Sequence, residues 1–482
     1  MRIFIQYDGT NVKRYDIPRK ERIMEKESGK KELSSKEKKR YLMEQETVGK
    51  ALLKLGLPTM VGMMTSALYN LVDTFFVGRL GTAQIAAVSV AFPISLLFLA
   101  VGLLFGSGAS SYLARLLGNK QYQEADECYS TALVTAVITG VGVIACMLIG
   151  LHPLLSLLGA TDTVMPYAKA YAIPFIMGLF FNVFNITMNN MIAAEGATNY
   201  SMTAMLAGGI TNMILDPILI MGLHMGVFGA AMATLISRII SFALYLYYIL
   251  SGKSNFHFSF HNVKPGKVLY KEIFKIGVPM LVYQILCSVA MSLTNFKAKE
   301  YGDAAVAGIG VANRILSLGA MMLTGFLKGY QPFVGFNYGA KKYDRARKAT
   351  KMMMIGSTIF CVVVAIAVML GNQTLIRLFS KTDTEVIQIG GKVLIANAIT
   401  FMGMGYAMVY NFMYMALGKA KQGGVISMSR QGIFFIPLVL ILPLFWGING
   451  IIFAQPIADL CVFFVIFLMN YHKEYIPKVA MI

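Results

Sequence analysis

The sequence has few charged residues. Only 14% of its 482 residues are Asp, Glu, Lys or Arg, whereas soluble proteins carry about 25%. Hydrophobic residues make up 56%, and the mean hydropathy is +0.62. A soluble domain needs charge for its surface, so ordinary soluble enzymes, disordered chains and secreted disulfide scaffolds are excluded. A protein that crosses the membrane many times remains, since about 20 apolar residues suffice for each crossing.

Motifs for bound metals and for enzymatic chemistry are also absent. The chain contains no Walker A sequence, no HExxH and no GxSxG, so ATP hydrolysis and common hydrolase chemistry are not expected. The cysteines form no CxxC and no Cys/His cluster; they are Cys128, Cys146, Cys287, Cys361 and Cys461. We therefore expect no enzyme and no cofactor, and we expect the energy for any transport to come from an ion or cargo gradient.

Apolar runs alternate with short polar breaks and predict an all-α polytopic membrane protein with twelve transmembrane helices. An even number of crossings places both termini on one side. The expected helices cover residues 55–77, 83–114, 128–150, 162–191, 198–222, 227–250, 273–296, 304–336, 352–371, 386–416, 424–444 and 450–470.

The distribution of loop charge predicts the orientation. Lys and Arg concentrate in the breaks on the N-terminal side, while the opposite breaks hold Arg79, Lys297, Lys299, Arg377 and Lys381. The basic side of a membrane protein is cytoplasmic, so we expect a multi-pass plasma-membrane protein with both termini inside. The net charge of +19 is then explained by basic cytoplasmic loops of a membrane protein rather than by binding to nucleic acid.

Residues 1–50 differ from the rest because they are charged and lack a long apolar run. They predict a solvated, basic cytoplasmic tail rather than a secretory signal. Within it, residues 2–8 favour a short strand and residues 30–46 favour a surface helix.

The two halves of the chain resemble each other at a nearly constant offset of 221 residues. Gly81 matches Gly302, Gly118 matches Gly339, and Leu55-Gly56-Leu57-Pro58 matches Ile276-Gly277-Val278-Pro279. The repeat predicts two pseudo-symmetric six-helix lobes, an N-terminal lobe over residues 51–257 and a C-terminal lobe over residues 258–482. Transporters built from such repeats bind cargo and coupling ions near the midplane, between lobes that rock.

A carboxylate inside a membrane is costly and requires a reason. Asp73 falls in the first expected helix, in the run SALYNLVDTFFVGRLG. It can form a cation or proton site, it can pair structurally with a polar neighbour, or it can lie near the outer interface, since Arg79 follows within two turns.

Asp216 is the second membrane carboxylate of this half. Asn212 precedes it by one helical turn, so both side chains share a face, and Pro217 disturbs the helix beside them. Thr234 adds a hydroxyl on the next helix. These oxygens suit Na⁺, or a proton held between crowded carboxylates, and oxygen chemistry alone does not choose between the two ions. Asn212 and Asp216 can also simply join helices.

The second half has fewer acidic residues in its helices, Asp459 being the clear one. Arg430 can hold a backbone carbonyl or face a cargo cavity, and Lys328 is another basic residue within these helices. Four polar residues are candidates for cargo contact, although such groups often only hold helices together: Gln284, Asn295, Asn411 and Arg430.

Several motifs together resemble the multidrug and toxic compound extrusion (MATE) family, especially its bacterial members. They are D-T-F-F-V-G-R-L-G at 73–81, A-A-E-G at 193–196, N-M-I-L-D-P at 212–217, G-V-F-G-A-A-M-A-T at 226–234, G-Y-Q-P-F-V-G-F-N-Y-G-A at 329–340 and S-R-Q-G-I-F-F-I-P at 429–437.

The resemblance implies two six-helix lobes around a V-shaped central cleft. It also implies antiport, in which amphipathic and often cationic drugs leave the cytoplasm in exchange for Na⁺ or H⁺. We expect the protein to be a monomer. By resemblance the ion site would include Asp73, Asn212, Asp216 and Thr234, together with Tyr171 and Asn189 on the fourth helix, with Asn190 as the alternative to Asn189. The alternative is a lipid-linked saccharide flippase of the same broad superfamily, which would need a wide basic groove.

Overall fold

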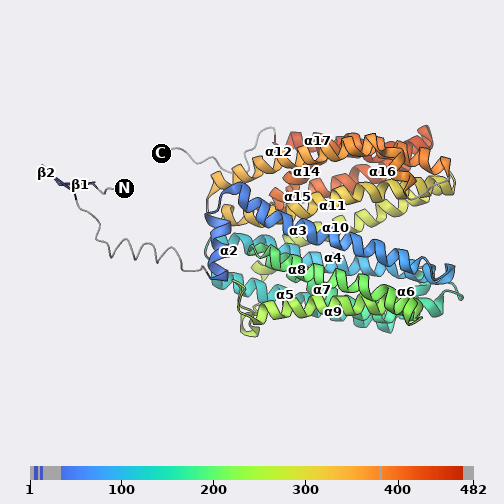
Figure 1. Ribbon diagram of the computed structural model, residues 1–482, viewed down its shortest axis with the longest axis horizontal. Helices are drawn as coiled ribbons and strands as arrows, with labels where there is room; N and C mark the ends of the chain where they lie inside the picture. The colour runs from blue at the N-terminus through green and yellow to red at the C-terminus, as the bar shows by residue number, and fades with distance from the viewer. Residues whose placement is uncertain (1–4, 9–10, 15–33, 379–382, 471–482) are drawn as a thin grey trace.

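The computed structural model describes residues 5–8, 11–14, 34–378 and 383–470. Twelve helices in these residues are long and apolar enough to cross a membrane, which confirms the predicted count. The helices run side by side, and a short helix, α2, lies across one end of the bundle (Figure 1). We call this the α2 end and the other the opposite end.

The first lobe consists of the helices between the N-terminal segment and the middle of the chain. Its helices are α3 (Val48–Val77), α4 (Thr82–Gly118), α5 (Tyr122–Ile149), the short α6 (Leu151–Leu157), α7 (Met165–Ala194), α8 (Thr198–Pro217) continued by the π-helix η1 (Ile218–Gly222), and α9 (Gly226–Leu250).

The second lobe repeats this order. Its helices are α10 (Lys267–Lys299), α11 (Asp303–Gly339), α12 (Tyr343–Leu370), the short α13 (Asn372–Arg377), α14 (Thr384–Ala416), α15 (Ala420–Met428) continued by the π-helix η3 (Ser429–Phe434) and α16 (Phe435–Trp446), and α17 (Ile448–Asn470). The predicted lobe boundary at residue 257 falls in the connection between α9 and α10, which contains the 3₁₀ helix η2 (Phe260–Asn262).

Several helices begin earlier than the apolar pattern predicts. The first begins at Val48 rather than 55, the seventh at Lys267 rather than 273 and the ninth at Tyr343 rather than 352. The apolar pattern marks only the part inside hydrocarbon, about 30 Å thick. Helical hydrogen bonding continues into charged sequence beyond it.

Backbone geometry repeats between the lobes as the sequence does. Gly81 and Gly302 precede α4 and α11 with φ of 107° and 96°, and Lys120 and Lys341 follow these helices with φ of 60° and 57°. Positive φ is uncommon for a non-glycine residue, so its occurrence at equivalent lysines reflects the same turn built twice.

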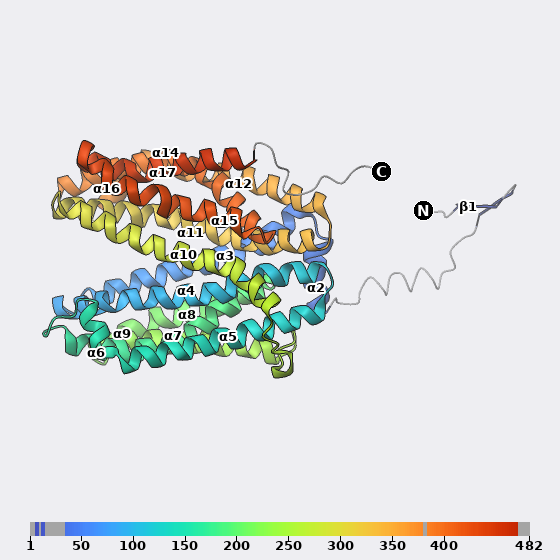
Figure 2. The same cartoon turned by 180° about the vertical axis from the view of Figure 1, so that it is seen from behind.

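The lobes meet through four helices near the α2 end. Helix α3 packs against α11, α10 packs against α4, and α4 packs against α11. An ion pair joins Arg115 of α4 to Glu272 of α10 at 2.9 Å. Glycines allow the backbones to approach, as at Gly329 of α11, which faces Leu55. Figure 2 shows the two lobes from behind, with α3 and α4 beside α10 and α11.

The N-terminal segment contains a two-stranded antiparallel hairpin, β1 (Ile5–Asp8) and β2 (Asn11–Arg14), and the helix α2 (Ser35–Glu44). The expected strand lies partly outside the described residues, and the expected helix is present. A reciprocal pair of hydrogen bonds between Ser34 and Glu37 caps it, as in a capping box.

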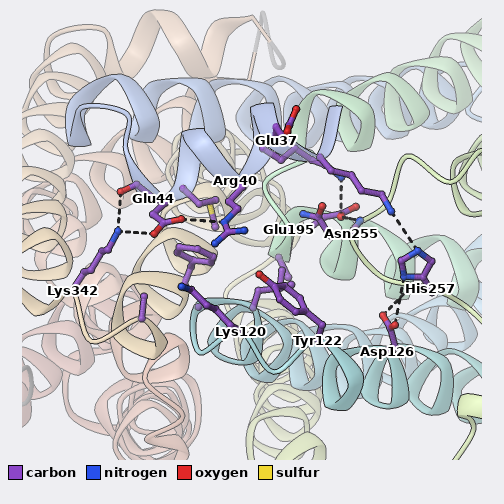
Figure 3. Close-up of a pocket in the computed structure, with 18 residues that line it drawn as sticks. Glu37, Arg40, Glu44, Lys120, Tyr122, Asp126, Glu195, Asn255, His257 and Lys342 are labelled. Atoms are coloured by element: carbon purple, nitrogen blue, oxygen red, sulfur yellow. Dashed lines mark hydrogen bonds and ion pairs between the residues drawn. The ribbon is translucent and has the colours of Figure 1, made fainter. Parts of the chain in front are cut away.

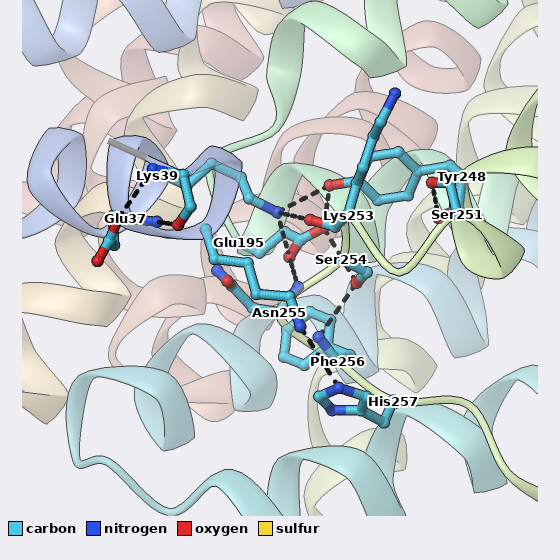
Figure 4. Close-up of polar contacts among 12 residues, drawn as sticks. Glu37, Lys39, Glu195, Tyr248, Ser251, Lys253, Ser254, Asn255, Phe256 and His257 are labelled. Atoms are coloured by element: carbon cyan, nitrogen blue, oxygen red, sulfur yellow. Dashed lines mark hydrogen bonds and ion pairs between the residues drawn. The ribbon is translucent and has the colours of Figure 1, made fainter. Parts of the chain in front are cut away.

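Helix α2 is bound rather than solvated, which corrects the expectation for residues 34–50. On the first lobe, Lys39 donates to Glu195 at 2.9 Å and to the Tyr248 hydroxyl at 2.9 Å (Figure 4). On the second lobe, Lys342 donates to Oε1 of Glu44 at 3.0 Å (Figure 3). A basic sequence looks like a solvated tail, but its partners lie far away in the chain.

Candidate functional site

The polar residues of α8 lie at the junction of α8 with the π-helix η1. Asp216 is fully buried, and Asn212 donates to its Oδ1 at 3.4 Å. Oδ2 of Asp216 and Oδ1 of Asn212 are buried without a hydrogen-bond partner. Pro217 follows directly and has no N–H to donate. The pair therefore offers two unused acceptor oxygens, the type of atom that a cation or an added proton requires.

Asp73 lies on α3, one turn before its end, and is half-buried. Helix α3 packs along α8, where the absence of a side chain at Gly209 lets Thr65 and Tyr69 of α3 approach. The Asp73 and Asp216 carboxylates are close enough for their charges to interact. The structure thus brings these two predicted residues into one cluster. The cluster lies in the half of the first lobe that is farther from α2.

Tyr171 borders this cluster, whereas Thr234 makes no hydrogen bond to its carboxylates in the described part of the chain. Tyr171 on α7 is buried, stacks on Phe175 with ring centroids 5.0 Å apart, and interacts electrostatically with both carboxylates. Thr234 lies on α9, one turn before Arg238, and is half-buried.

Asn189 lies elsewhere. Its Nδ2 donates to Oγ of Ser201 at 2.5 Å and to the Tyr245 hydroxyl at 3.1 Å. Ser201 and Asp216 are both on α8, and at about 1.5 Å rise per residue they are about 22 Å apart. The structure therefore places Asn189 in a helix contact near the α2 end, away from the carboxylates.

Arg238 belongs to the carboxylate cluster and was not predicted from the sequence. It lies midway along α9, its guanidinium is 4.9 Å from the Phe175 ring centroid, and its charge interacts with Asp73. Asn185 donates to its backbone oxygen at 2.9 Å. A lone arginine inside an apolar helix was the available signal, because such a charge is rare without a function.

Arg430 is held by a carboxylate, which corrects the expectation that it holds a backbone carbonyl. Its Nε donates to Oδ1 of Asp459 at 2.8 Å. Gln455 donates to the same oxygen at 2.8 Å, and the Thr400 hydroxyl donates to Oδ2 at 3.3 Å. Asp459 is thus fully paired, as buried ionic groups need to be.

The other cargo candidates do not converge. Asn295 is exposed near the opposite end of α10, whereas Asn411 lies near the α2 end of α14 with a buried, unpaired Oδ1. Gln284 is half-buried on α10, and its backbone oxygen accepts from Ser288.

A cavity of about 430 Å³ lies beneath α2, between the lobes (Figure 3). Its charged lining is largely paired, Lys39 with Glu195 and Lys342 with Glu44. The cavity is therefore lined by ion pairs that join α2 to the two lobes. Within residues 34–378 and 383–470, no three His, Cys, Asp or Glu side chains gather as metal ligands.

Comparisons with known proteins agree with this architecture. The family model MatE matches residues 58–218 and 279–441, one segment in each lobe. The multidrug export protein MepA of Staphylococcus haemolyticus is 28% identical over 436 residues, which cover 90% of this chain and 96% of that protein. MepA of Staphylococcus aureus is 28% identical over 425 residues, covering 88% and 94%.

Solved structures are similar over the same range. A crystal structure of MATE in complex with MaL6 has a TM-score of 0.85 at 26% identity, covering 89% of this chain and 97% of that one. The outward-facing conformation of a multidrug resistance MATE family transporter of the MOP superfamily has a TM-score of 0.84 at 26% identity, covering 89% and 96%. The two matched family segments begin at Pro58 and Pro279, which are partners in the internal repeat.

Proposed function

This chain belongs to the MatE family, as its motifs predicted, and on that premise we propose that it is a secondary antiporter of the plasma membrane. It exports amphipathic, often cationic drugs from the cytoplasm and admits Na⁺ or H⁺ in exchange. The names of the MepA relatives support drugs as cargo. The basic loops support a cytoplasmic α2 end.

The observation that carries the proposal is the pair of carboxylates, Asp73 and Asp216, in the first lobe. Two negative charges that interact in a membrane interior favour the uptake of a positive charge, and Asn212 and Asp216 supply unused buried oxygens for it. The side-chain amide of Asn212 donates a hydrogen bond to Asp216. The first lobe can therefore bind and release one cation or proton per transport cycle.

Coupling requires that this ion and the drug prefer different arrangements of the lobes. A tenfold preference of either ligand for one arrangement shifts the balance by about 1.4 kcal/mol. One charge that crosses 100 mV supplies about 2.3 kcal/mol. The lobes meet near the α2 end, so the described arrangement is the one that is closed there, and export requires a second arrangement that opens at that end.

The experiment is dye efflux from proteoliposomes that contain the full chain, with ethidium as cargo and imposed pH or Na⁺ gradients. We expect gradient-driven efflux by the native protein and little efflux by Asp73→Asn or Asp216→Asn at unchanged folded yield. Asp162→Asn is the matched control, since Asp162 is exposed in the connection before α7. Native efflux by Asp73→Asn removes Asp73 from the mechanism. Movement of a lipid-linked saccharide without dye efflux favours the flippase.

A further inference from the structure

A permanent cation lies among the carboxylates of the first lobe. We propose that Arg238 is a built-in counter-cation of this carboxylate cluster, through Asp73, and that it makes the exchangeable ion a proton and excludes Na⁺. The inference rests on the proposed function, because it names the coupling ion of the same antiporter.

The Arg238 guanidinium is placed by α7 rather than by a fixed acidic partner. It lies over the Phe175 ring at 4.9 Å, and Phe175 stacks on Tyr171. Gly178 leaves the required space, because a Cβ there would lie 3.3 Å from Nη1 of Arg238. A guanidinium keeps its charge under all physiological conditions, so this positive charge is a permanent part of the site.

Donor and acceptor atoms of the cluster remain unused. Nη1 of Arg238 is buried without a hydrogen-bond partner, and so are Oδ2 of Asp216 and Oδ1 of Asn212. Unpaired buried polar groups cost free energy. A rotation of the long arginine side chain onto a carboxylate would remove that cost.

The second lobe provides a contrast at the same position of the repeat. Asp459 occupies on α17 the place that Arg238 occupies on α9, at the offset of 221 residues. There the ion pair is made and fully hydrogen-bonded, through Arg430, Gln455 and Thr400. The Asp459 carboxylate of the second lobe is held by three donors, whereas the first-lobe cluster has buried donor and acceptor atoms without partners.

The groups that face one another fix the charge balance. They are Tyr69 and Asp73 from α3, Tyr171 from α7, Asp216 from α8 and Arg238 from α9. Two carboxylates and one guanidinium leave one negative charge when the tyrosines are neutral. One proton neutralises the cluster by bonding to a single carboxylate oxygen.

Na⁺ lacks this option because it needs several oxygen ligands at once. A guanidinium that rotated onto a carboxylate would also occupy lone pairs that Na⁺ needs. The Arg238 charge interacts with Asp73. By Coulomb's law, a fixed unit charge at a separation of about 6 Å weakens binding of a second cation by about a hundredfold when the effective dielectric constant is about 20. For a proton, this hundredfold loss of affinity lowers the pH of half-occupancy by about two units. For Na⁺, the same loss raises a Kd in the millimolar range about a hundredfold, so the site would stay largely empty in physiological salt.

The test compares Arg238→Met, Arg238→Lys and the control Arg314→Met in the full chain. Arg314 is exposed on α11 and lies about as far from the opposite end as Arg238 does on α9. Two readouts are used: ethidium efflux as a function of pH in Na⁺-free and Na⁺-loaded proteoliposomes, and the change in Tm on adding NaCl against choline chloride in detergent. We expect proton-driven, Na⁺-insensitive efflux for the native protein, Arg238→Lys and Arg314→Met.

Arg238→Met is expected to gain specific stabilisation by NaCl, and its efflux midpoint is expected to rise by about two pH units. Native efflux driven by Na⁺ alone overturns the inference, and so does an Arg238→Met variant with the native pH midpoint and no response to NaCl. If no variant moves ethidium under either gradient, the proposed function fails, and the NaCl-dependent Tm still tests Arg238. If Arg238→Met does not fold, Arg238→Gln replaces it with the same expectations.

Discussion

The ammonium of Lys39 lies 2.9 Å from Oε2 of Glu195, and both residues are buried, with 8% and 1% of their surface exposed (Figure 4). Burial lowers the pKa of Lys39 although the Glu195 carboxylate opposes this effect. Further donors reach Glu195 from Tyr248 and Ser254. The pair is thus a desolvated anchor between α2 and the first lobe.

Removing the cation of this anchor should cost stability. Lys39→Met leaves Glu195 buried without its cation, and breaking one half of a buried ion pair costs about 3–5 kcal/mol. We expect a clearly lower Tm in detergent. Arg40→Met on the same helix is the control, since Arg40 is exposed and its pair with Glu44 is a surface ion pair worth about 0–1 kcal/mol. Equal losses from both variants would contradict a specific anchor.

The contact of α2 with the second lobe should depend on acid. Lys342 lowers the pKa of Glu44 below its ordinary value of 4.5, against a smaller opposing effect of burial. A depressed carboxylate pKa contributes stability that is present above the unfolded-state pKa and is lost as pH falls through the folded-state pKa. Thermal unfolding of native protein and Glu44→Gln should therefore differ at pH 7, by about 1 kcal/mol or less, and converge as the pH falls below the folded-state pKa of Glu44. A difference that persists in acid would contradict this origin.

The ion pair of the second lobe should behave as structure. Asp459→Asn leaves Arg430 without its carboxylate, with an expected loss of about 3–5 kcal/mol, whereas Thr400→Val removes one neutral donor at about 1 kcal/mol. Efflux per folded molecule should stay near the native value in both variants. A selective loss of efflux by Asp459→Asn at native Tm would instead place this pair in the transport cycle.

The sequence predicted the twelve spans because each needs only a sufficient apolar run. It also placed Asp73, Asn212 and Asp216 together, since a shared helix face and a motif carry that information. Lys39 could not be predicted, because its burial depends on Glu195, which is 156 residues away. Asn189 lies on the helix predicted for it, but it contacts Ser201 and Tyr245 and not the carboxylates. Helix packing sets the level along the helix at which a side chain meets its neighbours, and the sequence pattern does not contain that information. Arg238 is a lone charge in an apolar helix, so the sequence does carry a signal for it.

Alternating access should respond to the close approach of the lobes at Gly325 of α11. A Cβ there would lie 2.7 Å from Cα of Met60 on α3, too close to fit without movement of the backbone. Gly325→Ala should therefore push the lobes apart at the α2 end and favour the arrangement that is open there. Gly310→Ala is the matched control on the same helix, because nothing lies within 4 Å of its added Cβ and alanine is the better helix former by about 1 kcal/mol. Spin labels on α3 and α11 near the α2 end should report longer distances in Gly325→Ala and native distances in Gly310→Ala. Native distances in both variants, with native Tm, would mean that the lobes do not close through this contact.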